Sequence, residues 1–311
     1  MNYVEFKSAT VGYASEIIDG GVTRLSQFSG VPDLWIETRP IVKNNVTLDG
    51  VSLKRTGCNI APTIYLNDLY EEFGDNVAMA VEKMAEVARV AYSQSSMEVD
   101  TNALGSWEYA KSRVFAKLIG PGNSELISGK PFKKMGDLYI IFAVRCDDAL
   151  QDPFGGGVAS YTITDDMLEP FGVATEDLYE AAISNMAETA EVRSIDGILV
   201  EMSLMEEGET TAVPMLVVTN KDRVYGAGSI LAPEVRKLLI KALGTEEIMI
   251  IPSSVHELIA ISKDCMDVDS VLAMVREVNR TCLAPQERLS DSVYELTPDS
   301  MLNPLAEANA A

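Results

Sequence analysis

The sequence feature that most constrains the fold is an uninterrupted apolar run at residues 138–144. The run is rich in β-branched and aromatic side chains, which favour a strand over a helix in so short a segment. It therefore predicts a buried strand. Residues 158–163 form a second short run after a glycine-rich stretch, and we expect the two strands to pair antiparallel. Part of the core should accordingly be a sheet.

Helices are predicted where apolar residues recur at steps of three and four, because this spacing places them on one face of a helix. Besides an opening helix, helices are expected at 75–92, 102–118, 165–168, 176–189, 233–243 and 268–279. Strands are expected at 34–38, 46–53, 138–144, 158–163, 198–204, 215–219 and 248–251. Hairpin turns are expected at Asn44 and Asn45, at Asp49 and Gly50, and at 206–209, since Asn and Gly tolerate positive φ.

Strands and helices alternate without a regular strand–helix–strand period, so the sequence favours neither a barrel nor a dinucleotide-binding fold. We predict an α+β fold with a mixed, mainly antiparallel sheet, flanking helices and two subdomains. A chain of 311 residues is longer than most single cores, which is consistent with two units. The predicted units are 1–125, mainly helical with a β-hairpin, and 136–297, which is α+β. Residues 298–311 are predicted to be a flexible tail.

The charge balance excludes several classes of partner. The chain carries 25 Lys and Arg against 47 Asp and Glu, for a net charge of -22. Because nucleic acids and anionic lipids attract concentrated cations, we expect no direct nucleic-acid binding and no membrane binding. DNA mimicry by surface carboxylates is one interpretation of the acidity, and a well-solvated surface is the simpler one. No apolar segment reaches about 20 residues and no signal peptide opens the chain, which predicts a cytoplasmic protein.

The spacing of cysteines and aspartates indicates no metal site and no cofactor. The cysteines form no Cys-x-x-Cys pair and are expected to be reduced and mostly buried. They are Cys58, Cys146, Cys265 and Cys282. Two aspartate groups could offer oxygen ligands to Mg²⁺ or Ca²⁺ but lack the spacing of a calcium-binding loop, so solvated loops and helix starts explain them better. They are Asp147, Asp148 and Asp152, and Asp264, Asp267 and Asp269.

The only histidine lies in a segment that could carry catalysis. The candidate residues are Ser253, Ser254, His256 and Glu257. An imidazole beside two hydroxyls and a carboxylate suggests an activated nucleophile, and histidine ordinarily changes charge near neutral pH. Residues so close in sequence rarely reach catalytic geometry, however, and the segment has no nucleophile elbow. We therefore interpret the serines as caps of a turn and His256 as a structural or ligand-facing group.

A polar turn followed by glycines is a candidate site for binding. The turn consists of Asn220, Lys221, Asp222 and Arg223. Such a turn can present a recognition surface, although an ordinary β-turn is the simpler interpretation. Gly226 and Gly228 then lie between a predicted strand and a predicted helix, which is the context of phosphate-binding loops. Neither glycine motif is complete and the phosphate-reaching lysine is missing, so a tight turn is favoured.

Six short strings stand out from the rest of the sequence. They are 42–45 (Val-Lys-Asn-Asn), 62–66 (Pro-Thr-Ile-Tyr-Leu), 136–139 (Gly-Asp-Leu-Tyr), 218–220 leading into 226–228, 251–257 (Ile-Pro-Ser-Ser-Val-His-Glu) and 289–294 (Leu-Ser-Asp-Ser-Val-Tyr). Together they resemble a bacterial domain of unknown function that occurs in the genomes, phages and mobile elements of gut anaerobes. The resemblance extends from about Phe6 to Glu295. It implies a bacterial or phage cytoplasmic setting and carries no activity.

These observations favour a binding role over an enzymatic one. The search for a complete catalytic motif fails, and the surface is strongly acidic. We therefore predict a non-catalytic interaction protein that acts through a protein partner. The alternative is a hydrolase or transferase with its site at Ser253, Ser254, His256 and Glu257.

Overall fold

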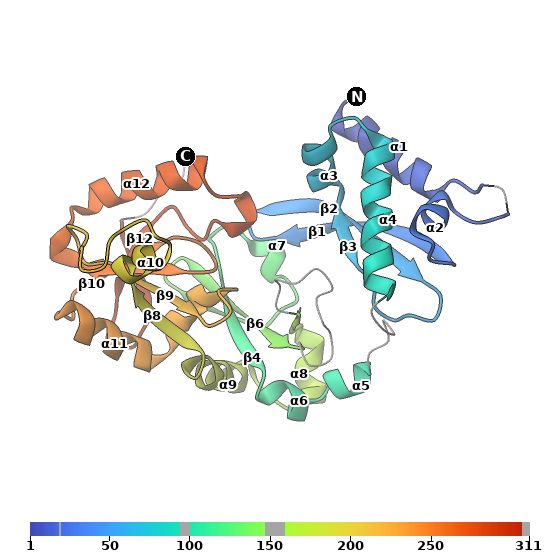
Figure 1. Ribbon diagram of the computed structural model, residues 1–311. Helices are drawn as coiled ribbons and strands as arrows, with labels where there is room; N and C mark the ends of the chain where they lie inside the picture. The colour runs from blue at the N-terminus through green and yellow to red at the C-terminus, as the bar shows by residue number, and fades with distance from the viewer. Residues whose placement is uncertain (19, 94–99, 147–158, 307–311) are drawn as a thin grey trace. The chain divides into compact units, whose positions relative to one another are not determined.

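The computed structural model describes residues 1–18, 20–93, 100–146 and 159–306 (Figure 1). Among these residues, 1–101 form one compact unit and those from 102 onward form another. Both units combine helices with antiparallel strands, which confirms the predicted α+β class. The strands are distributed over three sheets rather than one.

The first unit packs helices against a three-stranded sheet of order β1–β2–β3. Its strands are β1 (Leu34–Lys43), β2 (Val46–Arg55) and β3 (Thr63–Tyr65). Its helices are α1 (Tyr3–Ser15), α2 (Arg24–Ser29), α3 (Leu66–Phe73) and α4 (Val77–Ser93). The amphipathic helix predicted at 75–92 is α4, whose buried stripe includes Val81, Met84 and Ala88.

The predicted β-hairpin is present, with one of its two expected turns. Asn45 adopts a positive φ of 60° between β1 and β2, as asparagine does readily in a two-residue turn. Asp49 and Gly50 form no turn, because both lie within β2. Glycine is required there for space, since a Cβ on Gly50 would meet Ile41 Cγ1 at 2.6 Å.

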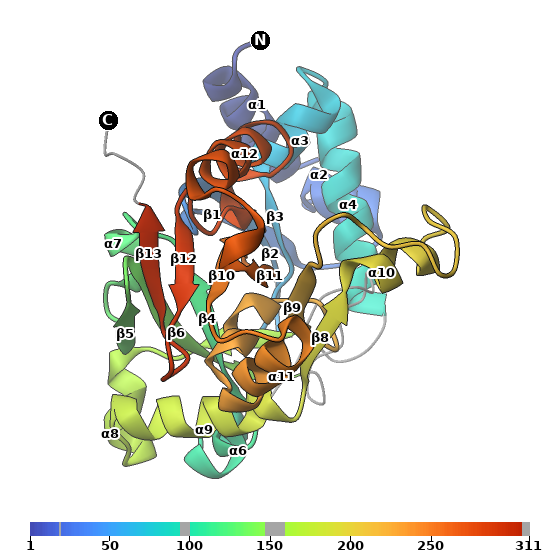
Figure 2. The ribbon, with the colours of Figure 1, turned by 90° about the vertical axis from the view of Figure 1, so that its left-hand side faces the viewer.

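The second unit contains a six-stranded antiparallel sheet of order β13–β12–β10–β11–β9–β8 (Figure 2). Its strands are β8 (Ala190–Ser194), β9 (Leu216–Asn220), β10 (Ile248–Pro252), β11 (Leu258–Ser262), β12 (Val293–Leu296) and β13 (Leu302–Ala306). A four-stranded sheet has the order β4–β6–β5, with β7 also paired to β6. Its strands are β4 (Val114–Ile119), β5 (Phe132–Met135), β6 (Leu138–Arg145) and β7 (Ser160–Thr162). The antiparallel pairing of β6 with β7 confirms the prediction from the two apolar runs.

Helices accompany both sheets of the second unit. The α-helices are α5 (Thr101–Leu104), α6 (Trp107–Lys111), α7 (Ser124–Ile127), α8 (Leu168–Phe171), α9 (Thr175–Ala187), α10 (Ile195–Glu201), α11 (Pro233–Leu243) and α12 (Val268–Thr281). The short 3-10 helices are η1 (Asp165–Met167), η2 (Gly226–Leu231), η3 (Lys263–Cys265) and η4 (Pro285–Glu287). The predictions for α11 and α12 are confirmed, including the proline start and the glycine stop of α11. Within the described part of the chain, no helix combines the length and the apolar character needed to cross a membrane.

The central strand β10 buries both of its faces, which explains its lack of polar alternation. Ile248 and Ile250 belong to the core that also contains the apolar side chains of β6. Met249 and Ile251 point to the opposite face and pack with α12. A strand covered on both sides reads as a continuous apolar run, because no position faces water.

Strand β4 lies at an edge of its sheet, and side chains of α9 cap its outer backbone groups. Asn185 Nδ2 donates to the carbonyl oxygen of Val114 at 2.9 Å. The backbone N–H of Ala116 donates to Met186 Sδ at 3.2 Å. Unpaired groups on an edge strand otherwise offer a template for another chain. Two residues of one helix therefore close this edge.

The helix predicted at 102–118 is wrong in its second half. The segment forms α5 and α6 and then becomes β4, which pairs with β6. Apolar residues over 114–118 are compatible with a helix stripe or with a strand buried on both faces. The partner strand decides between them, because β-propensity depends on the tertiary context. This pairing joins residues from the two predicted units, because β4 precedes residue 125 and β6 follows residue 136.

Three further predictions in the second unit are corrected. Residues 198–204 do not form a strand, because 195–201 form α10, whose cap Ser194 accepts a hydrogen bond from Gly197 N at 3.1 Å. The segment 206–209 is consequently a loop between a helix and β9, not a hairpin tip. Within the expected tail, residues 302–306 form β13 because they find a pairing partner in β12.

Candidate functional site

The predicted catalytic segment forms the loop between β10 and β11, and its polar groups bond to one another. Ser253 Oγ donates to Glu257 Oε1 at 3.2 Å, and the backbone N–H of His256 donates to Ser254 Oγ at 3.0 Å. Ser254 N also donates to the carbonyl oxygen of Glu257 at 3.0 Å. Serine hydroxyls commonly stabilise turns in this way. The loop is thus a closed turn held by its own side chains.

The imidazole of His256 is bonded to the backbone. Its Nδ1 accepts a hydrogen bond from the backbone N–H of Tyr225 at 3.1 Å. The carbonyl oxygen of His256 accepts from Thr219 Oγ1 at 2.9 Å. Among the residues that the structure describes, no hydrogen bond joins the ring to Ser253 or Ser254, so a nucleophile and its base are not assembled. His256 instead ties its loop to the turn after β9.

The predicted binding turn, residues 220–223, begins at the end of β9. The Asn220 side chain spans it, accepting from Val224 N at 3.2 Å and donating to the carbonyl oxygen of Val224 at 2.9 Å. Arg223 and Tyr225 have positive φ values of 55° and 52°. Residues other than glycine adopt this conformation at a cost of about 1–2 kcal/mol each. The surrounding hydrogen bonds therefore hold the segment in a strained shape.

Gly226 and Gly228 permit close packing at the start of η2. A Cβ on Gly226 would meet the carbonyl oxygen of His256 at 2.6 Å and the backbone nitrogen of Asn220 at 2.7 Å. A Cβ on Gly228 would meet the carbonyl oxygen of Ala116 at 2.5 Å. Both glycines are buried. They bring the turn, the His256 loop and β4 close together.

Two charged side chains fasten the turn to neighbouring elements. Lys221 Nζ donates to the carbonyl oxygen of Glu188 at 3.0 Å. Asp222 Oδ2 pairs with Arg145 Nη1, at the end of β6, at 2.6 Å. The side chains of this ion pair are 36% and 28% exposed, so both remain in contact with water.

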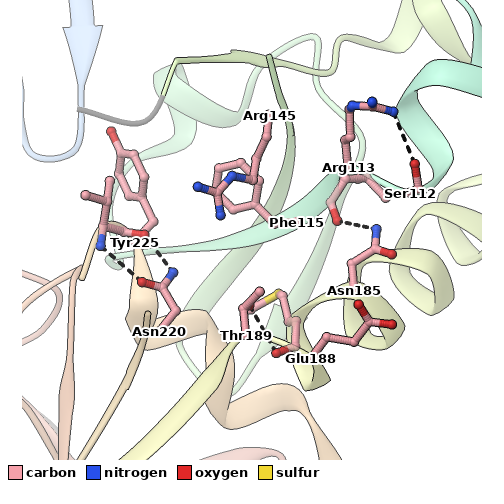
Figure 3. A pocket seen from close by; sticks show the side chains of 12 residues that line it. Ser112, Arg113, Phe115, Arg145, Asn185, Glu188, Thr189, Asn220 and Tyr225 are labelled. Carbon is pink, nitrogen blue, oxygen red and sulfur yellow. Dashed lines mark hydrogen bonds between the residues drawn. The ribbon is translucent and has the colours of Figure 1, made fainter. Parts of the chain in front are cut away.

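A pocket of about 120 Å³ lies beside the turn, against β4 and α9 (Figure 3). The rings of Phe115 and Tyr225 form an aromatic wall, with centroids 6.3 Å apart and planes tilted by 35°. Arg113, Arg145 and Glu188 also line it and bring charge to the pocket. Pockets that combine apolar walls with a few polar groups are the usual places for ligands.

A lysine lies behind the aromatic wall. Lys117 of β4 is only 8% exposed, and its Nζ lies 4.0 Å from the ring centroid of Tyr225 and 5.3 Å from that of Phe115. An ammonium group at these distances is attracted to the ring faces. The contact fixes the rings and places positive charge next to the pocket.

The sequence indicated the turn and the histidine but not the pocket that they adjoin. Arg113, Phe115 and Arg145 lie in segments far from the turn in sequence, and no motif spacing connects them. The one available signal was the place of Tyr225 between the predicted turn and Gly226. Spatial proximity of the turn and His256 was not predicted.

The candidate metal ligands serve other purposes or lie outside the described residues. Asp267 caps α12 by accepting from Ser270 N at 3.0 Å, and Asp269 lies in the first turn of that helix. In the described segments, no group of three or more His, Cys, Asp or Glu side chains could hold a metal ion. The other predicted group, Asp147, Asp148 and Asp152, lies outside the described residues.

The four cysteines are not disulfide-bonded, and their burial differs from the prediction. Cys146 is buried, whereas Cys265 and Cys282 are exposed. Cys265 lies in η3 and Cys282 lies directly after α12, and both side chains are exposed to solvent. The expectation that most cysteines are buried is therefore wrong.

Four of the six strings that stood out in the sequence lie in the second unit and meet there in pairs. The strings that contain Thr219 and His256 share the hydrogen bond described above. Asp137 and Tyr294, from two others, are joined because Tyr294 Oη donates to Asp137 Oδ1 at 2.8 Å. Burial raises the pKa of Tyr294 well above its usual range, which keeps this hydroxyl a donor. These unusual strings therefore join distant segments of the second unit.

One protein-family model covers most of the chain. The model of a family of unknown function, DUF5688, matches residues 20–297. The chain belongs to this family. The DUF5688 match includes the turn, the His256 loop and every residue of the pocket, and it confirms the expected membership of an uncharacterised family. Neither a curated protein nor a solved structure matches the chain.

Proposed function

We propose that this DUF5688 protein is a non-catalytic binding protein that acts through a protein partner. The proposal is carried by one observation: His256 Nδ1 accepts the backbone N–H of Tyr225 and so supports a strained turn. A general base needs its ring nitrogen within reach of a reacting proton. The geometry thus supports recognition better than the alternative of a hydrolase or transferase at the same loop.

The proposed contact surface is centred on the turn and the adjoining pocket. Tyr225, Phe115, Arg113 and Arg145 line that pocket. Tyrosine and arginine are enriched among the residues that dominate binding energy at interfaces. The hydrogen bonds around Asn220 pre-organise the turn, which reduces the entropy lost on binding.

The proposed setting is the cytoplasm of a bacterium, where the gene belongs to the genome, a phage or a mobile element. The resemblance noted in the sequence implies this setting. The absence of disulfides among the four cysteines suits a reducing compartment. The net charge of -22 disfavours nucleic acid as the partner, which leaves a protein as the best candidate.

The test is affinity purification of the tagged chain from its native host, followed by mass spectrometry. The comparison is between the wild type, Tyr225→Ala and the control Tyr139→Ala, each checked for an intact fold by its unfolding midpoint. Tyr139 packs in a separate cluster with Ile119, Ile127 and Ile141. We expect one protein to be captured by the wild type and the control but not by Tyr225→Ala. Equal capture by all three would reject the proposed surface, and turnover by the purified chain would favour the enzymatic alternative.

A further inference from the structure

We infer that the pocket binds a carboxylate group carried on a short apolar stem. When no ligand is bound, Asp222 pairs with the Arg145 guanidinium in place of the ligand's carboxylate. The inference rests on the proposed binding function and specifies its ligand. Its starting point is that Arg145 lines the pocket and already pairs with a carboxylate, at 2.6 Å from Nη1 to Asp222 Oδ2. The structure thereby shows which chemistry this guanidinium accepts.

The Arg145–Asp222 pair is replaceable. Both side chains are partly exposed, and ion pairs in such surroundings contribute little to stability. A ligand carboxylate offers the same charge and the same two acceptor oxygens. Exchange of Asp222 for the ligand therefore costs little free energy.

Asp222 can leave Arg145 without a change in the shape of the turn. Its side chain is 36% exposed and can rotate toward water. The backbone of the turn stays in place, because Asn220 accepts from Val224 N and donates to the carbonyl oxygen of Val224.

The remaining walls fit a short apolar stem. Val114 and Val224 line the pocket together with the rings of Phe115 and Tyr225. The volume of about 120 Å³ is slightly below that of an apolar cavity that holds benzene, about 150 Å³. The stem is therefore limited to a few carbon atoms, as in a glutamate side chain or a short-chain acid.

The charges around the pocket favour a negatively charged ligand. Arg113 and Arg145 line it, and Lys117 lies behind Tyr225. Figure 3 shows Glu188 at the side of the pocket away from Tyr225. Its carboxylate repels a second negative charge on a ligand. A carboxylate on an apolar stem is preferred over phosphate, because phosphate has no apolar part to contact the rings of Phe115 and Tyr225.

Two sources could supply this group. One is an acidic side chain of the protein partner, and the other is a free short-chain carboxylic acid. The chemistry at Arg145 is the same for both. The two sources are distinguished by whether capture of the partner protein requires the pocket.

The test is a titration of the full-length protein followed by NMR, with sodium butyrate as the probe. Butyramide, which has the same shape without charge, and inorganic phosphate are the comparators. We expect saturable shifts with butyrate and affinities at least about tenfold weaker for both comparators, because butyramide lacks the charged hydrogen bond and phosphate lacks the apolar stem. Equal affinity for butyrate and butyramide would overturn the inference.

Variants test the role of Asp222 directly. Asp222→Ala should bind butyrate up to about fivefold more tightly, the equivalent of about 1 kcal/mol for the lost internal competitor. Arg145→Ala should abolish binding. The matched control is Arg280→Ala, which removes an exposed arginine that pairs with Glu277 on α12, and should leave the affinity unchanged. Unchanged affinity in both Asp222→Ala and Arg145→Ala would place the butyrate elsewhere and refute the assignment.

Partner capture separates this inference from the proposed function. Loss of the captured protein with Arg145→Ala, together with competition by butyrate, identifies an acidic group of the partner as the ligand. Butyrate binding without any pocket-dependent capture supports the carboxylate site but rejects the protein partner. Capture that depends on Tyr225 but is insensitive to Arg145 and to butyrate keeps the proposed function and rejects the carboxylate site.

Discussion

The loop 253–257 and the Arg145–Asp222 pair both hold the turn after β9, but by different means. The loop uses neutral hydrogen bonds to the backbone, including the one from Tyr225 N to His256 Nδ1. The pair uses two charges that remain in contact with water. A partly buried donor that loses its acceptor keeps its desolvation cost, whereas exposed charges regain hydration. The loop should therefore determine the shape of the turn, and the pair should be available for exchange.

Gly226→Ala should have the largest effect, because it disrupts the contact between loop and turn. The new Cβ would meet the His256 carbonyl oxygen and the Asn220 backbone nitrogen, neither of which can rotate away. We expect a loss of about 3 kcal/mol in the free energy of unfolding, at the upper end for overpacking. Urea denaturation measures it. Gly12→Ala is the control, since a Cβ there has nothing within 4 Å and alanine favours its helix; similar losses in both variants would contradict the packing argument.

His256→Ala should have the second largest effect. Removal of the imidazole leaves the Tyr225 N–H without its acceptor, at a cost of about 1–3 kcal/mol. His256→Gln retains an acceptor and should lose less. The unfolding midpoints of the two variants, measured beside partner capture, provide the check. An unchanged midpoint together with abolished function would favour the catalytic interpretation and direct attention to Ser253 and Ser254.

Asp222→Ala should change stability least among the three substitutions. The exposed pair with Arg145 contributes at most about 1 kcal/mol, so the unfolding midpoint should move only slightly. If this variant were destabilised as much as His256→Ala, the ion pair would stabilise the turn as strongly as the loop does, and the proposed difference between them would be wrong. Raising the salt concentration should reduce even the small difference from wild type, because exposed charges are screened.

Divalent cations should have no effect on the unfolding temperature. The described residues contain no group of three or more potential ligand side chains, and the Asp222 carboxylate is already paired. A cation that binds only the folded state raises its unfolding temperature. Thermal unfolding with millimolar Mg²⁺ or Ca²⁺, or micromolar Zn²⁺, tests this against an ionic-strength control. A reproducible increase would reveal a metal site and contradict this prediction.

Sequence reasoning succeeded where one segment determines its own structure. The amphipathic spacing of α4 and α12 and the proline and glycine that bound α11 are local signals. It failed where a distant partner decides. Residues 114–119 became a strand because β6 pairs with them, and residues 302–306 were ordered by β12.

The candidate site illustrates the same limit. The turn at 220–223 and the segment with His256 were recognised separately, from residue types alone. Their contact through Tyr225 and Gly226 depends on how β9 and β11 pair. Arg113 and Arg145 come together because β4 pairs with β6, which no spacing in the sequence reveals.

The capping of β4 by α9 has a consequence for aggregation. Asn185 and Met186 are the side chains that bond to the outer groups of this edge strand, at Val114 and Ala116. When α9 loosens on mild heating, the strand edge becomes a site where a second copy of the chain can add a strand. Oxidation of Met186 to its sulfoxide would alter one of the two caps in the same way. The shelf life of the purified protein should therefore depend on one helix turn, whose residues Asn185 and Met186 also line the pocket.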